Sequence, residues 1–387
     1  MKIKLGSALC AAAIAVAACL AFSGCNADGG ENDKTTTKRA VYTYFGTAGS
    51  LVISADFSDS SVKKNLNTLN NNVVSFLSAL ESSISSSAEG SCIYYFNRAA
   101  AGESVKIDKT AYEVLSLAKS VYTLTGGYYN PAVFYSVDLY GFAPGSDLND
   151  YPRVSDGSML PKEEYVSAFR ELSAHFADVD VFEENGEYIA VKPADACVTV
   201  GGLTYNLKVD LGGIGKGYAA DRISELMEEA GFEYGYFDFG SSSMAVRKSY
   251  FGEDNRWSLG LLNPRGSGSY AYIKAASVNL STSGDYEKFF IEDGVRYCHI
   301  IDPTTGSPVQ TGIASCTVIG GTAAEDDALT TALTAMGKDR AIKFINDNLS
   351  DRKVVFTYIR ADGKIEIYSN CAAELYNIKS GFTVIEF

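Results

Sequence analysis

The sequence has few of the residues that several classes of protein require. Only two histidines, His175 and His299, occur among 387 residues, which excludes a metal site built from several histidine ligands. Basic residues are also scarce, because 33 lysines and arginines stand against 47 acidic residues and the formal net charge is −14. Nucleic-acid-binding proteins carry a basic surface. The composition therefore excludes a nucleic-acid partner and a polybasic membrane patch.

The eight cysteines form neither a disulfide framework nor a zinc-binding pattern. Cys10 and Cys19 belong to an apolar N-terminal run, and Cys25 follows it. The other five are widely spaced and odd in number, unlike the cysteines of disulfide-rich or zinc-binding domains. We expect these five to be small, buried apolar side chains: Cys92, Cys197, Cys298, Cys316 and Cys371.

The N-terminus has the pattern of a bacterial lipoprotein signal peptide. Lys2 and Lys4 precede the apolar stretch 5–22, and Phe22-Ser23-Gly24-Cys25 resembles a lipobox, whose cysteine receives the lipid. A plain secretory signal or a single membrane anchor would give a similar apolar run. We predict that residues 1–24 are a removed signal peptide and that the following cysteine is lipidated.

Lipidation of Cys25 would place the protein at the cell membrane, lipid-anchored on its extracytoplasmic face. Residues 25–40 are polar and lack apolar periodicity, so we expect a flexible tether. From residue 41 to residue 387 the hydrophobic patterning continues without a low-complexity break. We therefore expect a single folded domain over residues 41–387.

Helix-like and strand-like hydrophobic periods are mixed along this domain. Helices are expected at residues 62–84, 111–124 with Asp108 as the N-cap, 163–176, 218–230, 324–336 and 339–346. Strands are expected at residues 41–54 as a hairpin, 179–182, 188–192, 197–200, 207–211, 235–239, 243–248, 257–262, 270–278, 286–291, 296–301, 314–319, 354–359 and 365–368. The strands come in runs and do not alternate strictly with helices. This order predicts the α+β class, with largely antiparallel sheets and flanking helices.

The most distinctive stretch runs from Val209 to Asp221 and reads VDLGGIGKGYAAD. We expect a strand, a glycine loop and then a helix that begins near Tyr218. Glycines let main-chain N–H groups approach a ligand, and a helix N-terminus favours an anion. The spacing fits neither the Walker loop nor the dinucleotide fingerprint, and a tight turn is the alternative. Asp210 and Lys216 favour an anion site.

Asp327 and Thr331 lie four residues apart in the expected helix 324–336, so their side chains point to one face of it. A carboxylate with a hydroxyl, and no nitrogen or sulfur ligand, suits a hard cation such as Mg²⁺. Ordinary N-capping by Asp326 or Asp327 is the alternative. The pair is therefore either a cation site or a helix cap.

Two further stretches carry reactive or hydrogen-bonding groups. The small hydroxylated residues of 281–287 predict a turn that either donates hydrogen bonds to a ligand or only connects two strands. Asp302-Pro303-Thr304-Thr305-Gly306 also predicts a turn, with His299 on the strand before it. His299 is either a structural residue or the near-neutral proton carrier of a site.

Taken together and in this order, four stretches resemble the ApbE family of FAD:protein FMN transferases. They are Asp210–Asp221, Ser281–Glu287, His299–Gly306 and Asp327–Leu333, and the resemblance extends from about Tyr44 to the C-terminus. It implies an enzyme that splits the diphosphate of FAD with Mg²⁺, esterifies FMN to a threonine hydroxyl of a target protein and releases AMP. It also implies an α+β fold with two related βαβ-type halves.

The resemblance implies roles for individual residues. FAD would be contacted by Phe45, Tyr128, Tyr129, Asn130, Asp210, Lys216 and Ile301. Mg²⁺ would be held by the Gly213 carbonyl, Asp327 and Thr331, with Asp327 also counted as catalytic. Two positions depart from the family pattern, because Phe45 stands where methionine is usual and Asn130 where aspartate is usual.

The chemistry of the residues agrees with this assignment. Phosphoryl transfer needs charge neutralisation and alignment more than covalent protein chemistry, and a divalent ion, a lysine and a helix N-terminus supply both. His299 is then the candidate general base for the acceptor threonine, with Asp302 or a nearby backbone group fixing its tautomer.

The expected partners are FAD and an extracytoplasmic redox protein that carries the acceptor threonine. Two alternative functions remain open. The first alternative is a carrier lipoprotein that binds FAD without turning it over. The second is a hydrolase that splits the FAD pyrophosphate and passes FMN to water. Release of AMP separates the enzyme from the carrier, and a mass gain on an acceptor protein separates the transferase from the hydrolase.

Overall fold

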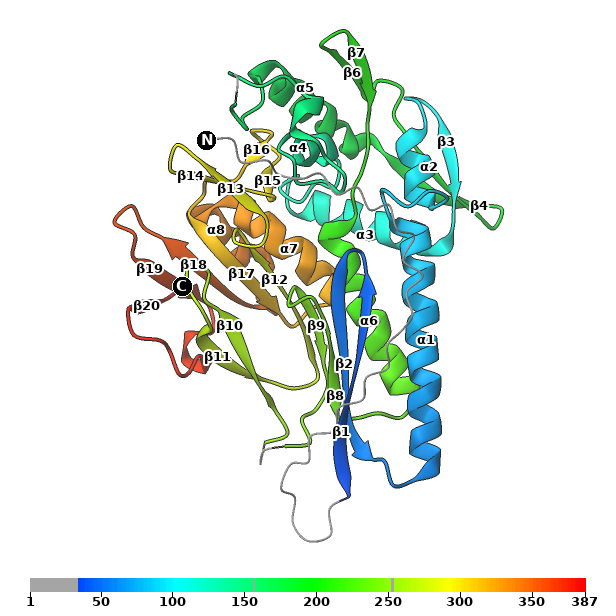
Figure 1. Ribbon diagram of the computed structural model, residues 1–387, viewed down its shortest axis with the longest axis vertical. Helices are drawn as coiled ribbons and strands as arrows, with labels where there is room; N and C mark the ends of the chain where they lie inside the picture. The colour runs from blue at the N-terminus through cyan, green and yellow to red at the C-terminus, as the bar shows by residue number, and fades with distance from the viewer. Residues whose placement is uncertain (1–33, 156, 252–253) are drawn as a thin grey trace, which may run out of the picture.

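The chain is organised around one nine-stranded sheet (Figure 1). The computed structural model describes residues 34–155, 157–251 and 254–387; the predicted signal peptide and Cys25 lie outside these ranges. In sheet order the strands are β1 (Thr35–Tyr44), β2 (Thr47–Asp56), β8 (Gly235–Phe239), β9 (Ser243–Val246), β12 (Val278–Gly284), β17 (Ile313–Ile319), β18 (Lys353–Ile359), β19 (Ile365–Ser369) and β20 (Phe382–Glu386). Neighbours are antiparallel except for β19 and β20.

The predicted α+β class with largely antiparallel sheets is confirmed. Helices α7 (Ala323–Met336) and α8 (Lys338–Asn348) lie in the chain between β17 and its antiparallel neighbour β18. This connection is therefore not a parallel βαβ unit. The relation between two βαβ-type halves stays a prediction.

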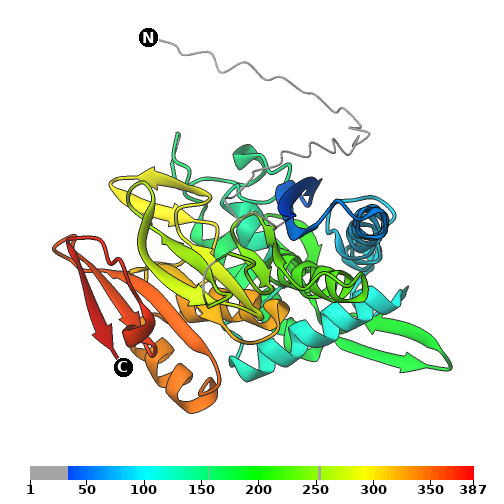
Figure 2. The same cartoon turned by 90° about the horizontal axis from the view of Figure 1, so that it is seen from below.

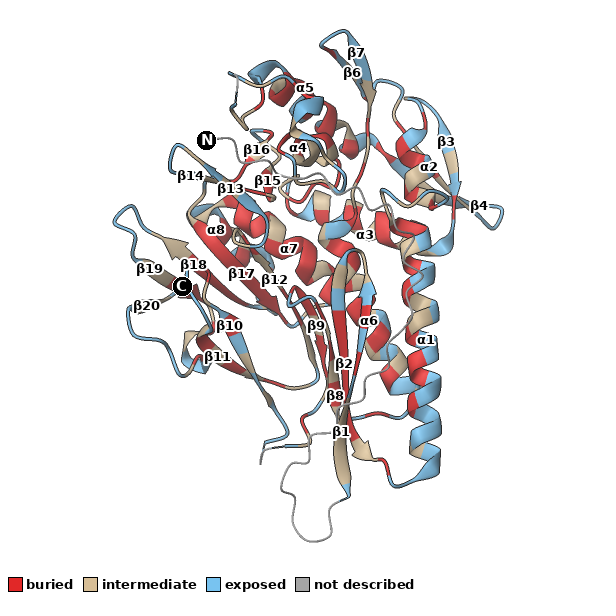
Figure 3. Cartoon of the chain, viewed as in Figure 1, coloured by how far each residue is buried: buried red, intermediate tan, exposed pale blue. Residues whose placement is uncertain are grey.

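Helices cover one face of the sheet in two layers. α6 (Gly212–Glu229) packs on β8 and β9, and α7 packs on β12 and β17. Outside them lie α1 (Ser60–Ile84) and α3 (Lys109–Leu124), and Figure 3 shows α1 buried on its inner side and exposed on its outer side. In Figures 1 and 2 the strands β18 to β20 lie far from α1, on the other side of the molecule.

The smaller elements surround this core. They are α2 (Cys92–Arg98), β3 (Ser104–Ile107), α4 (Phe134–Leu139), α5 (Glu163–Ala174), β4 (Asp180–Glu184), β5 (Glu187–Val191), β6 (Cys197–Val200), β7 (Leu203–Asn206), β10 (Trp257–Leu262), β11 (Ser269–Ala275), β13 (Phe289–Glu292), β14 (Val295–Cys298), β15 (Ile301–Asp302) and β16 (Ser307–Pro308). No helix within the described ranges is both long enough and apolar enough to cross a bilayer.

Two boundaries differ from the prediction, the end of the tether and the start of the helix after Val209. Strand pairing sets the first and helix packing sets the second. β1 begins at Thr35, where it pairs with Asp56 of β2, so the predicted tether 25–40 ends too late in the chain. The backbone of these polar residues is ordered by the hydrogen bonds of the hairpin. The predicted strand 207–211 is absent, and α6 begins at Gly212 and not near Tyr218.

The glycines of α6 are therefore helical, and one of them explains the misreading. A Cβ built on Gly217 would lie 2.1 Å from the Ala323 carbonyl oxygen and 2.6 Å from the Ala324 Cα. Only glycine lets α6 and α7 approach this closely. Glycine has low helix propensity, so sequence reasoning assigned a loop to residues that tertiary packing holds in a helix.

Two other local predictions are wrong. Residues 281–284 form the second half of β12, in the middle of the sheet, and not a turn. Their side chains are satisfied across the sheet, where Ser281 Oγ donates to Ser243 Oγ and the Thr282 and Thr317 hydroxyls are 2.8 Å apart. Cys197 is exposed, whereas Cys298, Cys316 and Cys371 are buried as expected and Cys92 is half-buried.

Candidate active site

One cavity of about 1080 Å³ contains the predicted site residues. Its volume is at the upper end of the range for small-molecule sites, which is roughly 300–1,000 Å³. Every site residue predicted within the described ranges lines it: Phe45, Tyr128, Tyr129, Asn130, Asp210, Gly213, Lys216, His299, Ile301, Asp327 and Thr331. The remaining prediction, the lipidated Cys25, lies outside the described residues.

The contact between α6 and α7 joins the glycine stretch to the predicted metal ligand. The Gly217 main-chain N–H donates to Asp327 Oδ2 at 3.2 Å. The α7 helix is capped by the Thr322 side chain, which accepts from the Glu325 N–H, so the interpretation of Asp326 or Asp327 as the N-cap is wrong. Asp327 is therefore free to serve the cavity.

Asp221 of α6 holds the first turn of α7 in place. Its carboxylate accepts from the main-chain N–H groups of Ala323 at 2.7 Å and Ala324 at 2.9 Å. It also accepts from Asn279 Nδ2 at 2.7 Å. A side chain of one helix thus satisfies the unpaired N–H groups at the start of the other, which fixes where Asp327 points.

Among the described residues, hydroxyl oxygens lie close to Asp327. The Thr331 hydroxyl lies 3.4 Å from Ser283 Oγ, and a Cβ built on Gly213 would lie 3.8 Å from Thr331 Oγ1. Gly213 therefore faces Thr331 across a space that a methyl group would begin to fill. Burial raises the pKa of Asp327, while the charge of Lys216 and the Gly217 N–H oppose this shift. A cation at this position would stabilise the ionised carboxylate.

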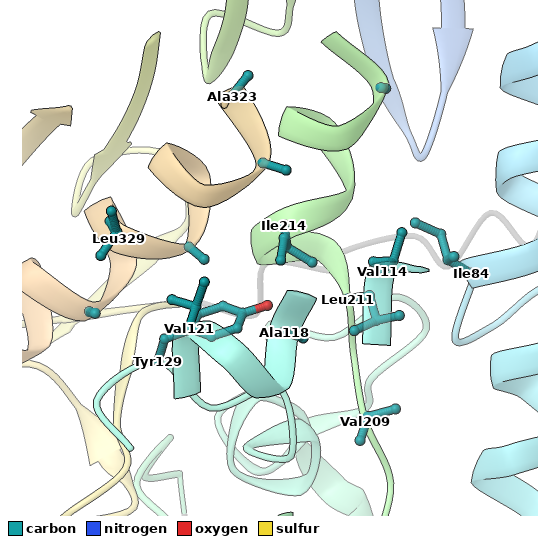
Figure 4. Packing of buried hydrophobic residues seen from close by; sticks show 14 of the residues in the cluster. Ile84, Val114, Ala118, Val121, Tyr129, Val209, Leu211, Ile214, Ala323 and Leu329 are labelled. Atoms are coloured by element: carbon teal, nitrogen blue, oxygen red, sulfur yellow. The ribbon is translucent and has the colours of Figure 1, made fainter. Parts of the chain in front are cut away.

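Tyr129 places an unpaired hydroxyl in the same region. Its ring lies between α7 and the first turn of α6 (Figure 4). A Cβ built on Gly213 would lie 3.5 Å from Cε2 of this ring. The hydroxyl is buried and has no hydrogen-bond partner in the described part of the chain. Burial, followed by the charges of Asp327 and Asp210, raises the pKa of Tyr129, so it stays a neutral donor. A buried donor of this kind is suited to a ligand oxygen.

Asp210 and Lys216 shape the start of α6. Asp210 Oδ1 accepts from the Gly212 N–H at 2.7 Å, and its Oδ2 accepts from Ser86 Oγ at 2.7 Å. Lys216 Nζ donates to the Gly212 carbonyl at 3.0 Å. The N–H groups of the first helical turn and one ammonium group thus meet at the cavity, an arrangement that favours an anion.

The two departures from the family pattern have different structural consequences. The Asn130 side chain holds its own loop, because Oδ1 accepts from the Ala132 N–H at 2.9 Å and Nδ2 donates to the Ser173 carbonyl at 3.0 Å. An aspartate could not donate the second bond. Phe45 occupies the β1–β2 turn with a positive φ of 51°, and its N–H donates to Glu81 Oε1 at 2.9 Å.

His299 follows β14 in a bend, and not on a strand as predicted. Its N–H donates to the Lys288 carbonyl at 3.0 Å. Burial lowers the pKa of His299 to about 4, with the charges of Lys216 and Lys288 acting in the same direction. The imidazole is therefore neutral at pH 7 and can accept a proton.

Asp302 does not orient the imidazole, so that part of the prediction is wrong. Asp302 Oδ1 accepts from the Thr304 N–H at 2.8 Å and from the Thr304 hydroxyl. His299 Nδ1 is buried and has no partner within the described residues. The carboxylate closes its own turn, and the main chain of His299 is held by its bond to the Lys288 carbonyl.

Sequence reasoning missed several residues of the cavity wall. Ser283 reaches Thr330 as well as Thr331, with 2.8 Å between the Ser283 and Thr330 hydroxyls. Glu287 also lines the cavity, and burial raises its pKa while the Lys216 charge lowers it. Both belong to the stretch 281–287, for which hydrogen bonding to a ligand was one of two interpretations, but neither was named as a site residue. Ser86 lies in a serine run that carried no such signal.

Comparisons with known proteins point to one family. The sequence profile of the ApbE family matches residues 45–356. The chain is 28% identical over 285 residues to "FAD:protein FMN transferase" of Treponema pallidum (strain Nichols), covering 71% of this chain and 73% of that protein.

Solved structures share the fold. The flavinyl transferase ApbE of Pseudomonas stutzeri in its apo form superposes with a TM-score of 0.71 at 20% identity, covering 88% of this chain and 96% of that one. The ApbE protein of Thermotoga maritima gives a TM-score of 0.67 at 26% identity, covering 85% and 96%.

Proposed function

The chain belongs to the ApbE family of FAD:protein FMN transferases, and we propose that it binds FAD with Mg²⁺ in the cavity and transfers FMN to a threonine hydroxyl of an acceptor protein. The observation that carries this proposal is the Gly217–Asp327 contact. It brings a buried carboxylate and the helix N-terminus that carries Lys216 to one cavity, which His299 also lines, although the three lie in separate parts of the sequence.

The residues around Asp327 fit a magnesium ion. Asp327, the Thr331 hydroxyl and the Gly213 carbonyl are hard oxygen donors, which Mg²⁺ prefers, and such sites leave further positions to water or phosphate. When bound, the ion supplies charge neutralisation for the diphosphate. Lys216 and the first turn of α6 would hold the same anionic group from the protein side, and the Tyr129 hydroxyl would donate to it.

The transfer is a substitution at phosphorus. The threonine oxygen forms a bond to the phosphorus of the FMN half of FAD, and the bond from that phosphorus to the bridging oxygen breaks, so AMP leaves. The proton of the threonine hydroxyl passes to the neutral imidazole of His299, whose lowered pKa keeps it unprotonated at pH 7. The products are a flavinylated protein and AMP.

Replacing His299 by alanine is expected to slow FMN transfer about 100-fold or more, because a positioned general base contributes 10²–10⁴. Binding of FAD and Mg²⁺ should persist. The measurement is AMP release together with flavin fluorescence of the acceptor band in a denaturing gel. His175→Ala is the matched control, because His175 lies beside Asp195 at 3.5 Å and not at the cavity.

The same assay tests the proposed function itself. Transfer at the unaltered rate in His299→Ala would remove the general-base role. AMP release without a mass gain on any acceptor would favour the hydrolase, and FAD binding without AMP release would favour the carrier.

We also propose that the chain is lipid-anchored through Cys25 and that its acceptor is an extracytoplasmic redox protein. The lipobox-like Phe22-Ser23-Gly24-Cys25 supports the anchor. Cells that express the chain and are fed a tagged fatty acid should label it, and Cys25→Ser should remove the label. An unlabelled wild-type chain would contradict the anchor.

A further inference from the structure

The β13–β14 hairpin begins beside the active-site cavity, and Figure 1 shows it at the edge of the molecule. Lys288 and Phe289 at its base line the cavity together with His299. The tip is a two-residue turn, Asp293-Gly294, in which both φ angles are positive, at 51° and 78°. Turns of this type match the twist of the flanking strands, so the hairpin is well formed.

One strand of this hairpin has a free edge. In an antiparallel pair, residues that exchange hydrogen bonds alternate with residues whose backbone groups point away. The His299 N–H donates to the Lys288 carbonyl, and Phe289 pairs with Cys298 and Ile291 with Arg296 in the ladder that follows. The N–H and C=O groups of Phe289 and Ile291 therefore point away from β14. They have no hydrogen-bond partner in the described part of the chain.

Two side chains of this strand, Phe289 and Ile291, are apolar and partly open to solvent, and the Arg296 guanidinium lies over one face of the Phe289 ring. Phe289 is 41% exposed and Ile291 is 55% exposed. Natural proteins usually protect an edge strand with lysine, proline or a covering element, because unpaired backbone groups recruit other chains. β13 contains neither lysine nor proline. An exposed apolar edge strand beside a catalytic cavity is suited to binding a segment of a partner protein.

The hairpin is held rigidly on its other face. The Phe290 ring stacks on Phe142 at 5.8 Å and on Tyr297 at 5.1 Å. Glu292 accepts from Ser158 Oγ at 2.6 Å and from the Met159 N–H at 3.0 Å. A preformed edge loses little conformational entropy when a partner binds.

We propose that an extended segment of the acceptor protein pairs with the free edge of β13 as an added strand, which leads its threonine into the cavity beside His299. This inference rests on the proposed function, because FMN transfer requires a protein hydroxyl to reach a half-buried histidine. Strand addition takes its affinity from main-chain hydrogen bonds and its specificity from alternate side chains. Phe289 and Ile291 would contact those side chains.

The decisive variant is Ile291→Pro, with Ile291→Val as its matched control. Proline removes the outward N–H of residue 291, and an edge strand tolerates proline where that N–H faces solvent. The probe is a pool of short synthetic peptides, each with one central threonine and randomised flanks, incubated with the full chain, FAD and Mg²⁺. Mass gain of FMN on peptide and release of AMP are both recorded.

For the best peptide of the pool, we expect Ile291→Pro to raise KM about tenfold, because one hydrogen bond and the close approach of the strand are lost. Ile291→Val should leave that KM near the unaltered value, and the KM for FAD should stay the same in both variants. N-methylation of successive peptide residues should raise the peptide KM at every second residue and leave it unchanged at the residues between. A purely structural effect of the proline would not produce this alternation.

Each other outcome overturns something definite. An unaltered chain that releases no AMP overturns the proposed function and this inference with it. A chain that transfers FMN to an acceptor protein but modifies no peptide, or an Ile291→Pro chain with an unchanged peptide KM, overturns strand pairing alone. If the unaltered chain is a dimer in solution and the Ile291→Pro chain is a monomer, the edge of β13 pairs with a second copy of the chain. That result overturns pairing with the acceptor.

Discussion

Replacing Asp327 by alanine is expected to abolish FMN transfer and the dependence of FAD binding on Mg²⁺. The carboxylate is the only charged group among the three predicted metal ligands, and a metal ion that neutralises charge in phosphoryl transfer is worth several kcal/mol, or about 10³-fold in rate. AMP release and acceptor fluorescence measure the loss directly, and FAD titrations with and without Mg²⁺ measure the dependence.

A second substitution separates this loss from a folding defect. Asp327→Asn keeps an oxygen that can accept the Gly217 N–H, and it removes a carboxylate whose ionised form burial disfavours. At pH 8 the asparagine variant should therefore be at least as stable as the unaltered chain, yet equally inactive. Activity near the unaltered level in this variant would contradict the metal role of Asp327.

The neighbouring residue provides the matched control. Asp326 is fully buried in the same helix, but it accepts from the Gly321 N–H at 3.2 Å and lies 3.3 Å from Arg352 Nε, away from the cavity. Asp326→Asn changes the same charge one position earlier. Burial raises the pKa of Asp326 to about 7 in spite of the Arg352 charge, so at pH 8 the asparagine should not lower stability through the lost charge, and FMN transfer should stay intact.

Strongly periodic segments could be predicted from the sequence, and segments governed by packing could not. The helices at 62–84, 111–124 and 324–336 were placed within two residues of α1, α3 and α7, because their apolar spacing is clear. The stretch 281–284 was assigned to a turn because its composition is that of a turn. In the structure it is a central strand whose Ser281 and Thr282 hydroxyls bond to those of Ser243 and Thr317 on the neighbouring strands.

The site shows the same division. Its members could be predicted because four stretches together resemble one family, whose other site positions could then be located, and all predicted members within the described residues line a single cavity. Their individual roles depend on neighbours that no local pattern reveals. The Asn130 side-chain amide accepts from the Ala132 N–H and donates to the Ser173 carbonyl. Asp302 bonds to its own turn and not to His299. The Asn130–Ser173 bond joins residues 43 positions apart in the chain, so spacing in the sequence does not encode it.

The close approach of α6 and α7 leads to the second large effect, which is expected from Gly217→Ala. The added methyl group would lie 2.1 Å from the Ala323 carbonyl oxygen, 2.4 Å from its carbon and 2.6 Å from the Ala324 Cα. All three are main-chain atoms, and Asp221 bonds to the N–H groups of the same two residues. The helix α7 cannot move away without breaking these bonds.

We expect Gly217→Ala to lower the melting temperature by about 5 °C or more, because overpacking costs about 1–3 kcal/mol and a large domain loses about 2–4 °C per kcal/mol. FMN transfer should be lost as well, since Asp327 moves with α7. Gly215→Ala is the control for stability, because its methyl group would meet only the flexible end of Ile84, at 2.8 Å from Cδ1. Alanine also has the higher helix propensity, so Gly215→Ala should melt near the unaltered temperature. If Gly217→Ala melted there too and kept its transfer rate, the helix contact would not be what positions Asp327.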